Sequence, residues 1–332
     1  MVVLGPQISA RRMPRIRNAR LSAGVFLLCA ALQGCVALVP QTVELRDRWP
    51  RDVPEKVELI DVPFFPQREY QCGPAALATA LAYFNVPVTA DDLVDKVYIP
   101  ERKGSVQAEM LAAPRRYGMV SYALAPRFDD LLRELADGTP VVVLQNYGAG
   151  PLKLWHYATA VAYNAHVGGL TLRSGEWENW WMPLAIFEYT WRDSGYWAMV
   201  VVPPDRMPAT ADRARYLEAL VAFERAGNPQ AAVTAYSKYL ERWPSELGAS
   251  IGLANAYYAL GDLNQTATVL KGALARHPES VPVMNNLAQT LSDLGRNKEA
   301  LEVIKRAPAA DSTHGESVRE TRALIEKRLR RR

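Results

Sequence analysis

The spacing of hydrophobic residues divides this 332-residue chain into parts. Between residues 58 and 204, segments with apolar side chains at helical spacing come first: 72–84, 89–99, 105–118 and 128–138. Segments with alternating or β-branched apolar residues mostly follow and predict strands: 139–148, 156–164, 169–175 and 196–204, with one earlier strand at 57–65. Helices followed by strands predict an α+β domain over residues 58–204.

Beyond the proline-rich segment PPDRMPATADRA, the apolar pattern is helical and it repeats. Gly227, Gly261 and Gly295 are 34 residues apart. Three further columns keep this spacing: Phe223, Tyr257 and Leu291; Ala232, Thr266 and Ala300; Tyr236, Leu270 and Ile304. A 34-residue period with small residues where helices cross resembles the tetratricopeptide repeat. Residues 211–329 are therefore predicted to form an all-α domain of about three repeats, closed by a capping helix at 316–329.

The first 35 residues have the pattern of a targeting segment. Five arginines and no acidic residue precede the short apolar run LSAGVFLLCAAL, which leads into Leu32-Gln33-Gly34-Cys35. This tetrapeptide resembles the lipobox of bacterial lipoproteins, in which the cysteine is lipidated and becomes the mature N-terminus. The alternatives are an ordinary signal peptide cleaved elsewhere, or an uncleaved anchor.

The lipoprotein resemblance implies a location and a role for the residues that follow. Residues 36–57 are rich in proline and charge, lack a strong period, and are predicted to be a tether. A lipid on Cys35 would hold the protein to a membrane of the bacterial cell envelope. Val36 replaces the aspartate that commonly signals retention in the inner membrane, which favours the outer membrane, with the protein facing the periplasm.

The charge of the chain gives little support to a nucleic-acid partner. Without residues 1–35, the chain holds 34 basic and 35 acidic residues, whereas phosphate binding needs a concentrated basic face. The sequence has no paired Cys or His spacing typical of a metal site and no glycine-rich phosphate loop. We therefore expect no metal and no cofactor.

The three cysteines leave one candidate nucleophile. Cys29 would be lost on cleavage and Cys35 would carry lipid, so Cys72 would be the one free thiol of the mature protein. Cys72 begins the predicted helix CGPAALATALAYF, where backbone N–H groups favour a thiolate, and Gly73 leaves room for a substrate. Of the histidines, His156 opens the predicted strand HYATAVAYN and is the candidate base.

The segments PQREYQCGPAALATAL and HYATAVAYN resemble the papain-like, bacterial double-glycine-leader peptidases and their stand-alone relatives. The resemblance covers roughly residues 58–204 and implies a papain-like cysteine peptidase domain. It implies Cys72 as nucleophile, His156 as general base and Gln67 as oxyanion donor. Gln67 lies five residues before the cysteine where the family more often has six, so Gln71 is the alternative donor.

The third member of the expected triad departs from the family pattern. Where the family has an aspartate after the next strand, GLTLRSG places Ser174. A serine can orient an imidazole through a hydrogen bond but stabilises an imidazolium less than a carboxylate does. Glu176 and Asn179 are close in sequence and are alternatives. Cysteine enzymes tolerate this change better than serine enzymes, because the ion pair forms before substrate binds.

These observations lead to one prediction and two alternatives. The prediction is a lipid-anchored cysteine peptidase that hydrolyses a peptide or protein substrate, with the repeats recruiting substrate or partner in their groove. The alternatives are a catalytically inactive scaffold, which Ser174 supports, and an acyl transferase or amidase acting on cell-wall substrates. The aromatic cluster EWENWWMPLAIFEYTW is expected mainly to pack in the core and at a sheet edge, although it could also line an apolar substrate cleft.

Overall fold

The computed structural model describes residues 38–307 and 314–331. Cys35 and the rest of the predicted targeting segment lie outside the described residues. The described residues fall into two units, one ending at Trp49 and the other beginning at Pro50. The first unit contains helix α2 (Pro40–Asp47), which begins with a proline at a position where the missing N–H is not needed. In the described part of the chain, no helix combines the length and apolar character required to cross a membrane.

The segment predicted as a tether has more structure than expected. It contains α2, and strand β1 (Lys56–Glu58) pairs antiparallel with strand β6, with Lys56 opposite Asn164. The sheet domain therefore starts before residue 58. The strand predicted over 57–65 ends at Glu58, because the chain turns at Ile60 and Asp61, where the Val62 amide donates to the Leu59 carbonyl at 3.3 Å.

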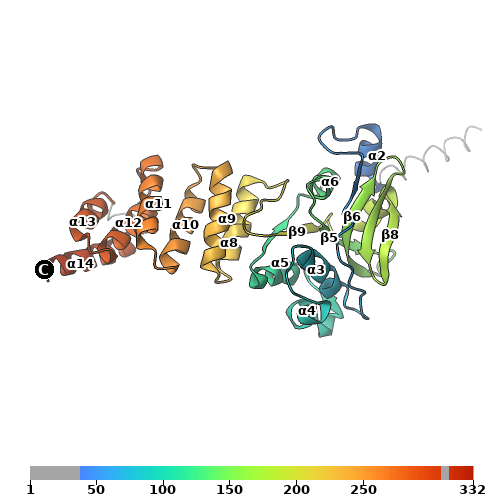
Figure 1. The fold of residues 1–332 in the computed structure, drawn as a ribbon, viewed down its shortest axis with the longest axis horizontal. Helices are drawn as coiled ribbons and strands as arrows, with labels where there is room; N and C mark the ends of the chain where they lie inside the picture. Colours follow the sequence, from blue (N-terminus) through green and yellow to red (C-terminus); the bar gives the residue numbers. More distant parts are fainter. Residues whose placement is uncertain (1–37, 308–313, 332) are drawn as a thin grey trace, which may run out of the picture. The chain divides into compact units, whose positions relative to one another are not determined.

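A seven-stranded antiparallel sheet organises the first part of the second unit (Figure 1). The predicted α+β class is confirmed. The two strands at the ends of the strand order, β4 (Val120–Ala123) and β8 (Trp177–Pro183), were not predicted. In spatial order the strands are β4 (Val120–Ala123), β9 (Ala198–Val202), β5 (Val141–Asn146), β6 (Trp155–Asn164), β7 (Gly169–Ser174) and β8 (Trp177–Pro183), with β1 also on β6. A two-stranded hairpin of β2 (Tyr98–Ile99) and β3 (Gly104–Ser105) lies apart from this sheet.

Helix α3 (Cys72–Tyr83) is the centre of the core and fixes the position of its first residue. Its first ten residues are buried, and Thr159 on β6 donates a hydrogen bond to its Ala76 carbonyl at 3.0 Å. Gly73 is required by close packing, since a Cβ there would lie 2.2 Å from Ser105 Oγ. Contacts with β6 and with the β2–β3 hairpin thus hold the first turns of α3 from two sides.

The remaining helices of this domain follow the predicted segments closely. Thr89 is the N-cap of α4 and forms a reciprocal capping box with Asp92. Helix α7 was not predicted as a separate element. The bounds are α4 (Ala90–Val97), η1 (Pro100–Arg102), α5 (Gln107–Ala112), η2 (Ala113–Tyr117), α6 (Phe128–Ala136) and α7 (Leu184–Arg192).

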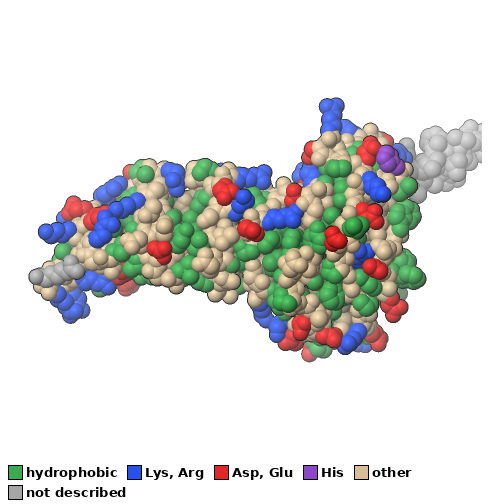
Figure 2. Space-filling view, in the orientation of Figure 1, with side chains coloured by type: hydrophobic (Ala, Val, Ile, Leu, Met, Phe, Trp, Pro, Cys, Tyr) green, Lys and Arg blue, Asp and Glu red, His purple; other side chains and the backbone are tan. Residues whose placement is uncertain are grey.

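Three helix pairs and a last helix follow the sheet domain (Figure 1). The repeated glycines lie in the turn inside each pair with φ of 86°, 76° and 77°, a conformation that favours glycine. The small residues of the repeat, Ala232, Thr266 and Ala300, are buried between helices. The helices are α8 (Arg213–Glu224), α9 (Pro229–Arg242), α10 (Leu247–Ala259), α11 (Leu263–Arg276), α12 (Val281–Asp293), α13 (Asn297–Lys305) and α14 (Gly315–Arg330). On the face shown in Figure 2, acidic and basic side chains are interspersed.

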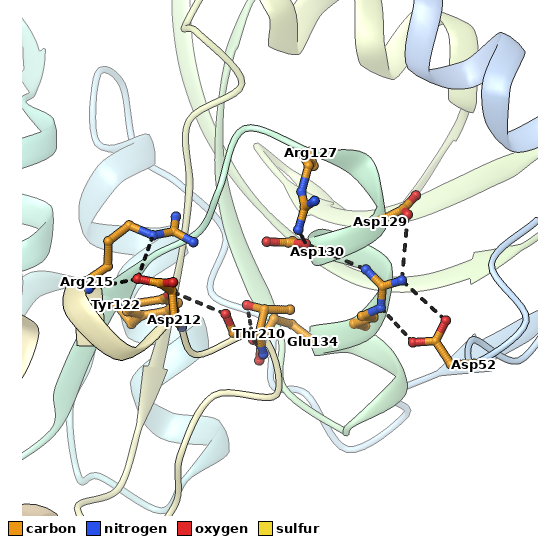
Figure 3. Close-up of polar contacts among 10 residues, drawn as sticks. Asp52, Tyr122, Arg127, Asp129, Asp130, Glu134, Thr210, Asp212 and Arg215 are labelled. Atoms are coloured by element: carbon orange, nitrogen blue, oxygen red, sulfur yellow. Dashed lines mark hydrogen bonds and ion pairs between the residues drawn. The ribbon is translucent and has the colours of Figure 1, made fainter. Parts of the chain in front are cut away.

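A buried carboxylate joins the sheet domain to the first repeat (Figure 3). Glu134 on α6 is fully buried and accepts hydrogen bonds from the Thr210 amide at 2.8 Å, the Thr210 hydroxyl at 2.6 Å and the Ala209 amide at 3.3 Å. Tyr122 on β4 donates to the Thr210 carbonyl at 3.2 Å and accepts from the amide of Asp212, the N-cap of α8. The segment that leads into the repeats is therefore held by the sheet domain.

The opposite side of α6 carries a second set of charges (Figure 3). Arg133 contacts Asp52 through two hydrogen bonds, of 2.7 and 3.3 Å, and lies 3.7 Å from Asp129 and from Asp130. The Asp130 carboxylate is almost fully buried and also accepts from Arg127 at 2.8 Å. The Arg133–Asp52 contact thus attaches the segment before β1 to α6, the helix that also binds the segment leading into the repeats.

Candidate active site

A cleft of about 960 Å³ in the sheet domain contains the principal residues that the sequence analysis singled out. Its walls come from the segment before α3, the β2–β3 hairpin, the facing ends of β5 and β6, and the end of α7. One rim is ordered by Asn146, whose Oδ1 accepts from the amides of Gly148 and Leu154. Asn146 Nδ2 donates to Asp193, which also pairs with Lys153 at 2.5 Å. The loop between β5 and β6, which forms this rim, is therefore anchored by Asn146 at one end and by the Lys153–Asp193 pair at the other.

Cys72 lies at the first residue of α3 and lines this cleft, with 9 % of its surface exposed. Burial raises the pKa of the Cys72 thiol, and hydrogen bonds from the backbone of Tyr157, Gly73 and Cys72 itself oppose the rise. Backbone N–H groups at the helix start favour the thiolate, as expected, but loss of solvation is the larger effect. The free thiol is thus predominantly protonated near neutral pH.

His156 lies near the start of β6 and lines the same cleft. Its Nε2 atom is 2.8 Å from Ser174 Oγ, and its ring stacks on Tyr147 with centroids 5.1 Å apart and an interplanar angle of 26°. Burial lowers the pKa of His156 to about 4, so the imidazole is neutral near neutral pH. This corrects the expectation of a preformed ion pair, because burial disfavours the charged form of both partners.

The contact with His156 distinguishes Ser174 from the two alternatives. Ser174 ends β7, is 8 % exposed, and is hydrogen-bonded to the imidazole. Asn179 instead accepts a hydrogen bond from Arg173, and Glu176 is exposed. The structure therefore brings the residue at the family's aspartate position, rather than a nearby carboxylate, to the histidine.

The two candidate oxyanion donors lie in different places. Gln67 lines the cleft, and its backbone N–H donates to the Gly175 carbonyl at 3.0 Å, beside Ser174. Its side-chain Oε1 is buried and has no hydrogen-bond partner in the described part of the chain. Gln71 forms the N-cap of α3 and is not among the cleft residues. Of the two candidates, Gln67 is the one that lines the cleft.

Arg173 is a contributor that the sequence analysis did not identify. Its guanidinium is buried and donates to the Val62 carbonyl at 2.9 Å and to the Glu178 carbonyl at 2.7 Å, besides Asn179. It thereby holds the segment that leads to Gln67 against β7. The one signal in the sequence is an arginine next to a candidate site residue, and its Val62 partner lies 111 residues away along the chain.

The aromatic cluster divides into two groups. Phe187 and Trp191 are fully buried in the core. Trp177, Trp180 and Trp181 on β8 are exposed by 63 %, 38 % and 51 % of their surfaces, and they are not among the cleft residues. The expectation of core packing is confirmed for the first group, and the second group lies on β8, at one end of the strand order, outside the lining of this cleft.

Cys72, His156 and Gln67 line one cleft, so a thiol, an imidazole and an amide side chain share a single site. Nε2 of His156 is engaged by Ser174, and Nδ1 is the other ring nitrogen. Within residues 38–307 and 314–331, no group of three His, Cys, Asp or Glu side chains is placed to hold a metal.

Comparison with known families assigns both parts of the chain. Residues 59–199 match the family described as Peptidase_C39 like, and residues 213–245 and 259–325 match two tetratricopeptide repeat families. The chain thus consists of a C39-like peptidase domain followed by tetratricopeptide repeats, as the resemblances predicted. None of the proteins with curated descriptions matches the chain.

Several solved structures are similar to the first part of the chain. A C39-like peptidase from Bacillus anthracis is 17 % identical, with a TM-score of 0.39, and the match covers 45 % of this chain and 98 % of that one. The double glycine motif protease of an AMS/PCAT transporter is 20 % identical, with a TM-score of 0.35, over 43 % and 91 % of the two chains. The peptidase domain of Streptococcus ComA is 18 % identical, with a TM-score of 0.35, over 43 % and 98 %.

Proposed function

We propose that this chain, which joins a C39-like peptidase domain to tetratricopeptide repeats, is a cysteine peptidase acting on a peptide or protein substrate. The observation that carries the proposal is the cleft itself. It brings together Cys72 at a helix start, His156 with one ring nitrogen engaged by Ser174, and Gln67 beside them. A thiol, a base and an amide donor at one accessible cleft are the groups that acyl transfer to cysteine requires.

The reaction starts from a neutral pair. As the Cys72 sulfur attacks the substrate carbonyl carbon, its proton passes to Nδ1 of His156, and a carbon–sulfur bond forms. The carbonyl oxygen becomes negative and accepts a hydrogen bond from Gln67. Collapse breaks the carbon–nitrogen bond, the imidazolium returns the proton to the leaving amine, and a thioester remains. Water, deprotonated by His156, then hydrolyses the thioester and restores the thiol.

The remaining parts of the chain suit a protein that works at a membrane. The lipobox-like sequence at Cys35 supports attachment through lipid to the bacterial cell envelope, with the outer membrane facing the periplasm as the proposed site. The repeats bear no residue of the cleft. We assign to them the recruitment of the substrate or of a protein partner, the usual role of such arrays.

Two observations favour a second candidate, an inactive scaffold with the peptidase fold. Ser174 is a neutral residue where a carboxylate is expected, and burial disfavours both charged forms of the Cys72–His156 pair. In that case the domain binds peptides or partners without cleaving them. The two candidates make opposite predictions for one experiment.

The experiment is cleavage of a diverse peptide library by the purified full chain, read by mass spectrometry. We expect products that disappear in Cys72→Ala, and a loss of about 10²- to 10⁴-fold in His156→Ala, which removes the general base. His277→Ala is the matched control, because this histidine lies in the repeats, 2.8 Å from the Ser245 carbonyl. Equal product formation by the wild type and Cys72→Ala would contradict the peptidase. Peptide binding without products would support the scaffold.

A further inference from the structure

We propose that Arg102 and Lys103 form a binding site for an acidic side chain of the peptide substrate, on the Cys72 side of the cleft. The inference rests on the peptidase function proposed above and names a chemical feature of its substrate. It concerns binding, so its failure can be distinguished from a failure of the cleavage reaction.

The two basic residues lie in the turn of the β2–β3 hairpin, which packs against the start of α3. Arg102 ends η1, and Lys103 follows it directly before β3. The packing contact is made by Ser105, whose Oγ would lie 2.2 Å from a Cβ on Gly73, the residue after Cys72. Both basic residues line the cleft, as Cys72 does. Two positive charges therefore face the cleft from the hairpin that supports the nucleophile.

The charges of these two residues are not neutralised by the protein in the part of the chain that the structure describes. Both side chains are exposed, and neither forms an ion pair with a described carboxylate. Lys153, the third basic residue of the lining, is instead paired with Asp193 at 2.5 Å. Glu69 is the other acidic residue of the lining. The cleft thus presents two unpaired cations and one opposing carboxylate to a substrate.

The backbone conformation of Lys103 indicates that its placement in the cleft is specific. Lys103 and Tyr70 have φ of 47° and 62°, in the left-handed region that favours glycine. The Lys103 ammonium lies 5.4 Å from the centre of the Tyr70 ring, and both residues line the cleft. Two of the four described non-glycine residues with positive φ therefore meet at this site. Glycine at either position would relieve the strain but would remove the ring or the charge, and such strain is concentrated at functional sites.

The contact with the ring leaves the ammonium available to a second partner. A lysine ammonium has three hydrogens, and a neutral aromatic ring does not cancel its charge. The guanidinium of Arg102 adds donors beside it, and a carboxylate accepts charge-assisted hydrogen bonds from both groups. The ring of Tyr70 thus orients the ammonium, and the ligand that completes the site is the carboxylate of an Asp or Glu side chain.

Another wall of the cleft offers no such site. Tyr147, Leu154 and Trp155, in the loop between β5 and β6 and at the start of β6, are exposed and line the cleft. They present apolar surface, which gives a carboxylate no compensation for lost hydration. A substrate that carries an acidic side chain is therefore oriented with that side chain towards the hairpin. Because the cations are exposed, we expect a preference for acidic peptides of about three- to tenfold.

The preference can be measured without cleavage, with the full chain carrying Cys72→Ala. A peptide library in which Asp, Asn, Glu, Gln, Lys and Arg are equally frequent at every varied position is passed over the immobilised chain. The retained peptides are identified by mass spectrometry. We expect enrichment of Asp and Glu over Asn and Gln by about three- to tenfold, and a smaller enrichment at high salt, which screens exposed charges.

Three further variants assign the preference to the hairpin. The double variant Arg102→Glu, Lys103→Glu should reverse the preference in favour of Lys and Arg. Glu69→Gln removes the opposing carboxylate and should strengthen the preference for acidic peptides. Arg51→Glu is the matched control, because Arg51 is exposed and lies outside the cleft lining, and it should change nothing.

Each outcome separates the binding site from the peptidase. Retained peptides without an acidic preference, a preference unchanged in the double variant, or retention of no peptide would overturn the inference. An acidic preference in binding, with equal product formation by the wild type and Cys72→Ala, would defeat the peptidase and leave the binding site standing. Products that depend on Cys72 but show no preference for acidic residues near the cleaved bond would defeat the binding site alone.

Discussion

The two domains of this protein bury polar side chains for different purposes. In the repeats, Ser250, Thr266 and Thr290 are buried and donate to the carbonyl four residues earlier in their own helix. Such bonds satisfy the hydroxyl locally, bring no distant segment closer, and ask nothing of the fold beyond a helix. A short sequence period is therefore enough to specify these contacts, and they bring no reactive side chains together.

The sheet domain buries polar groups that join distant parts of the chain. Arg173 bonds the Val62 carbonyl across 111 residues, Thr159 reaches the Ala76 carbonyl across 83, and Gln145 reaches Thr190 across 45. Each such bond is costly to leave unmade inside a core, so together they force one arrangement of the cleft. The site is therefore held by long-range polar contacts, and we expect substitutions there to change the reactivity of Cys72 more than the free energy of unfolding.

The largest change in chemistry is expected from Ser174→Asp. A carboxylate in place of the Ser174 hydroxyl, which lies 2.8 Å from Nε2, stabilises the imidazolium and raises the pKa of His156 from about 4, so more of the Cys72–His156 pair exists as an ion pair. We expect the neutral-pH rate of Cys72 alkylation to rise about tenfold for each unit by which the pKa of His156 increases. The measurement is the alkylation rate between pH 4 and 10. Ser174→Ala is the control and should lower the rate; an unchanged rate in both variants would mean that residue 174 does not act on the histidine.

The next largest effect is expected on the free energy of unfolding, at Glu134, which binds the segment between the sheet domain and the repeats. Burial raises the pKa of Glu134, so the folded state binds its proton more tightly than the unfolded state. The contribution of Glu134 to stability therefore falls as pH rises above the ordinary range of a glutamate. Glu134→Gln places an NH₂ group against backbone donors and should cost about 1–3 kcal/mol at pH 5. Urea unfolding should show a smaller cost at pH 8, and a larger one would contradict the direction of the shift.

The smallest effects are expected in the repeats, where they should leave the cleft unchanged. Gly261 has φ of 76°, and among the described residues no heavy atom crowds its Cβ position, so Gly261→Ala should cost about 1 kcal/mol through backbone strain alone. Gly272 lies inside α11, and a Cβ added there would have the Arg276 guanidinium 3.6 Å away as its nearest side-chain contact. Gly272→Ala should therefore stabilise by about 0.5–1 kcal/mol. Urea unfolding measures both. A change in Cys72 alkylation in either variant would break the separation between the domains.

The repeats and the ends of the main helices could be predicted because their signals are local. A 34-residue period requires glycine in one turn of each unit, and Thr89 and Asp92 lie in the same helical turn. The pairing of Cys72 with His156 in one cleft was predicted from the family resemblance. Ser174 at the aspartate position followed from the end of a strand whose bounds the sequence indicated well.

The features that escaped prediction depend on distant contacts. Tyr147 lies in a loop sequence, and its stacking on His156 depends on the register that sets Gln145 opposite His156. The pKa directions of Cys72 and His156 also escaped, because they depend on burial by elements far along the chain. A helix start alone favours a thiolate, and only the packed structure shows that loss of solvation exceeds this effect.

The pH profile of Cys72 alkylation in the full chain, with His156→Ala beside it, tests the central claim most directly. The claim is that His156 accepts the proton of Cys72 from a neutral resting pair. It predicts a rate plateau above about pH 5, set by the low pKa of His156, and a further rise in more alkaline solution, beyond the ordinary range of a thiol, as Cys72 itself ionises. His156→Ala should lose the plateau and keep the rise. A single rise at the thiol pKa, identical in both proteins, would contradict the claim and leave Cys72 as a structural residue.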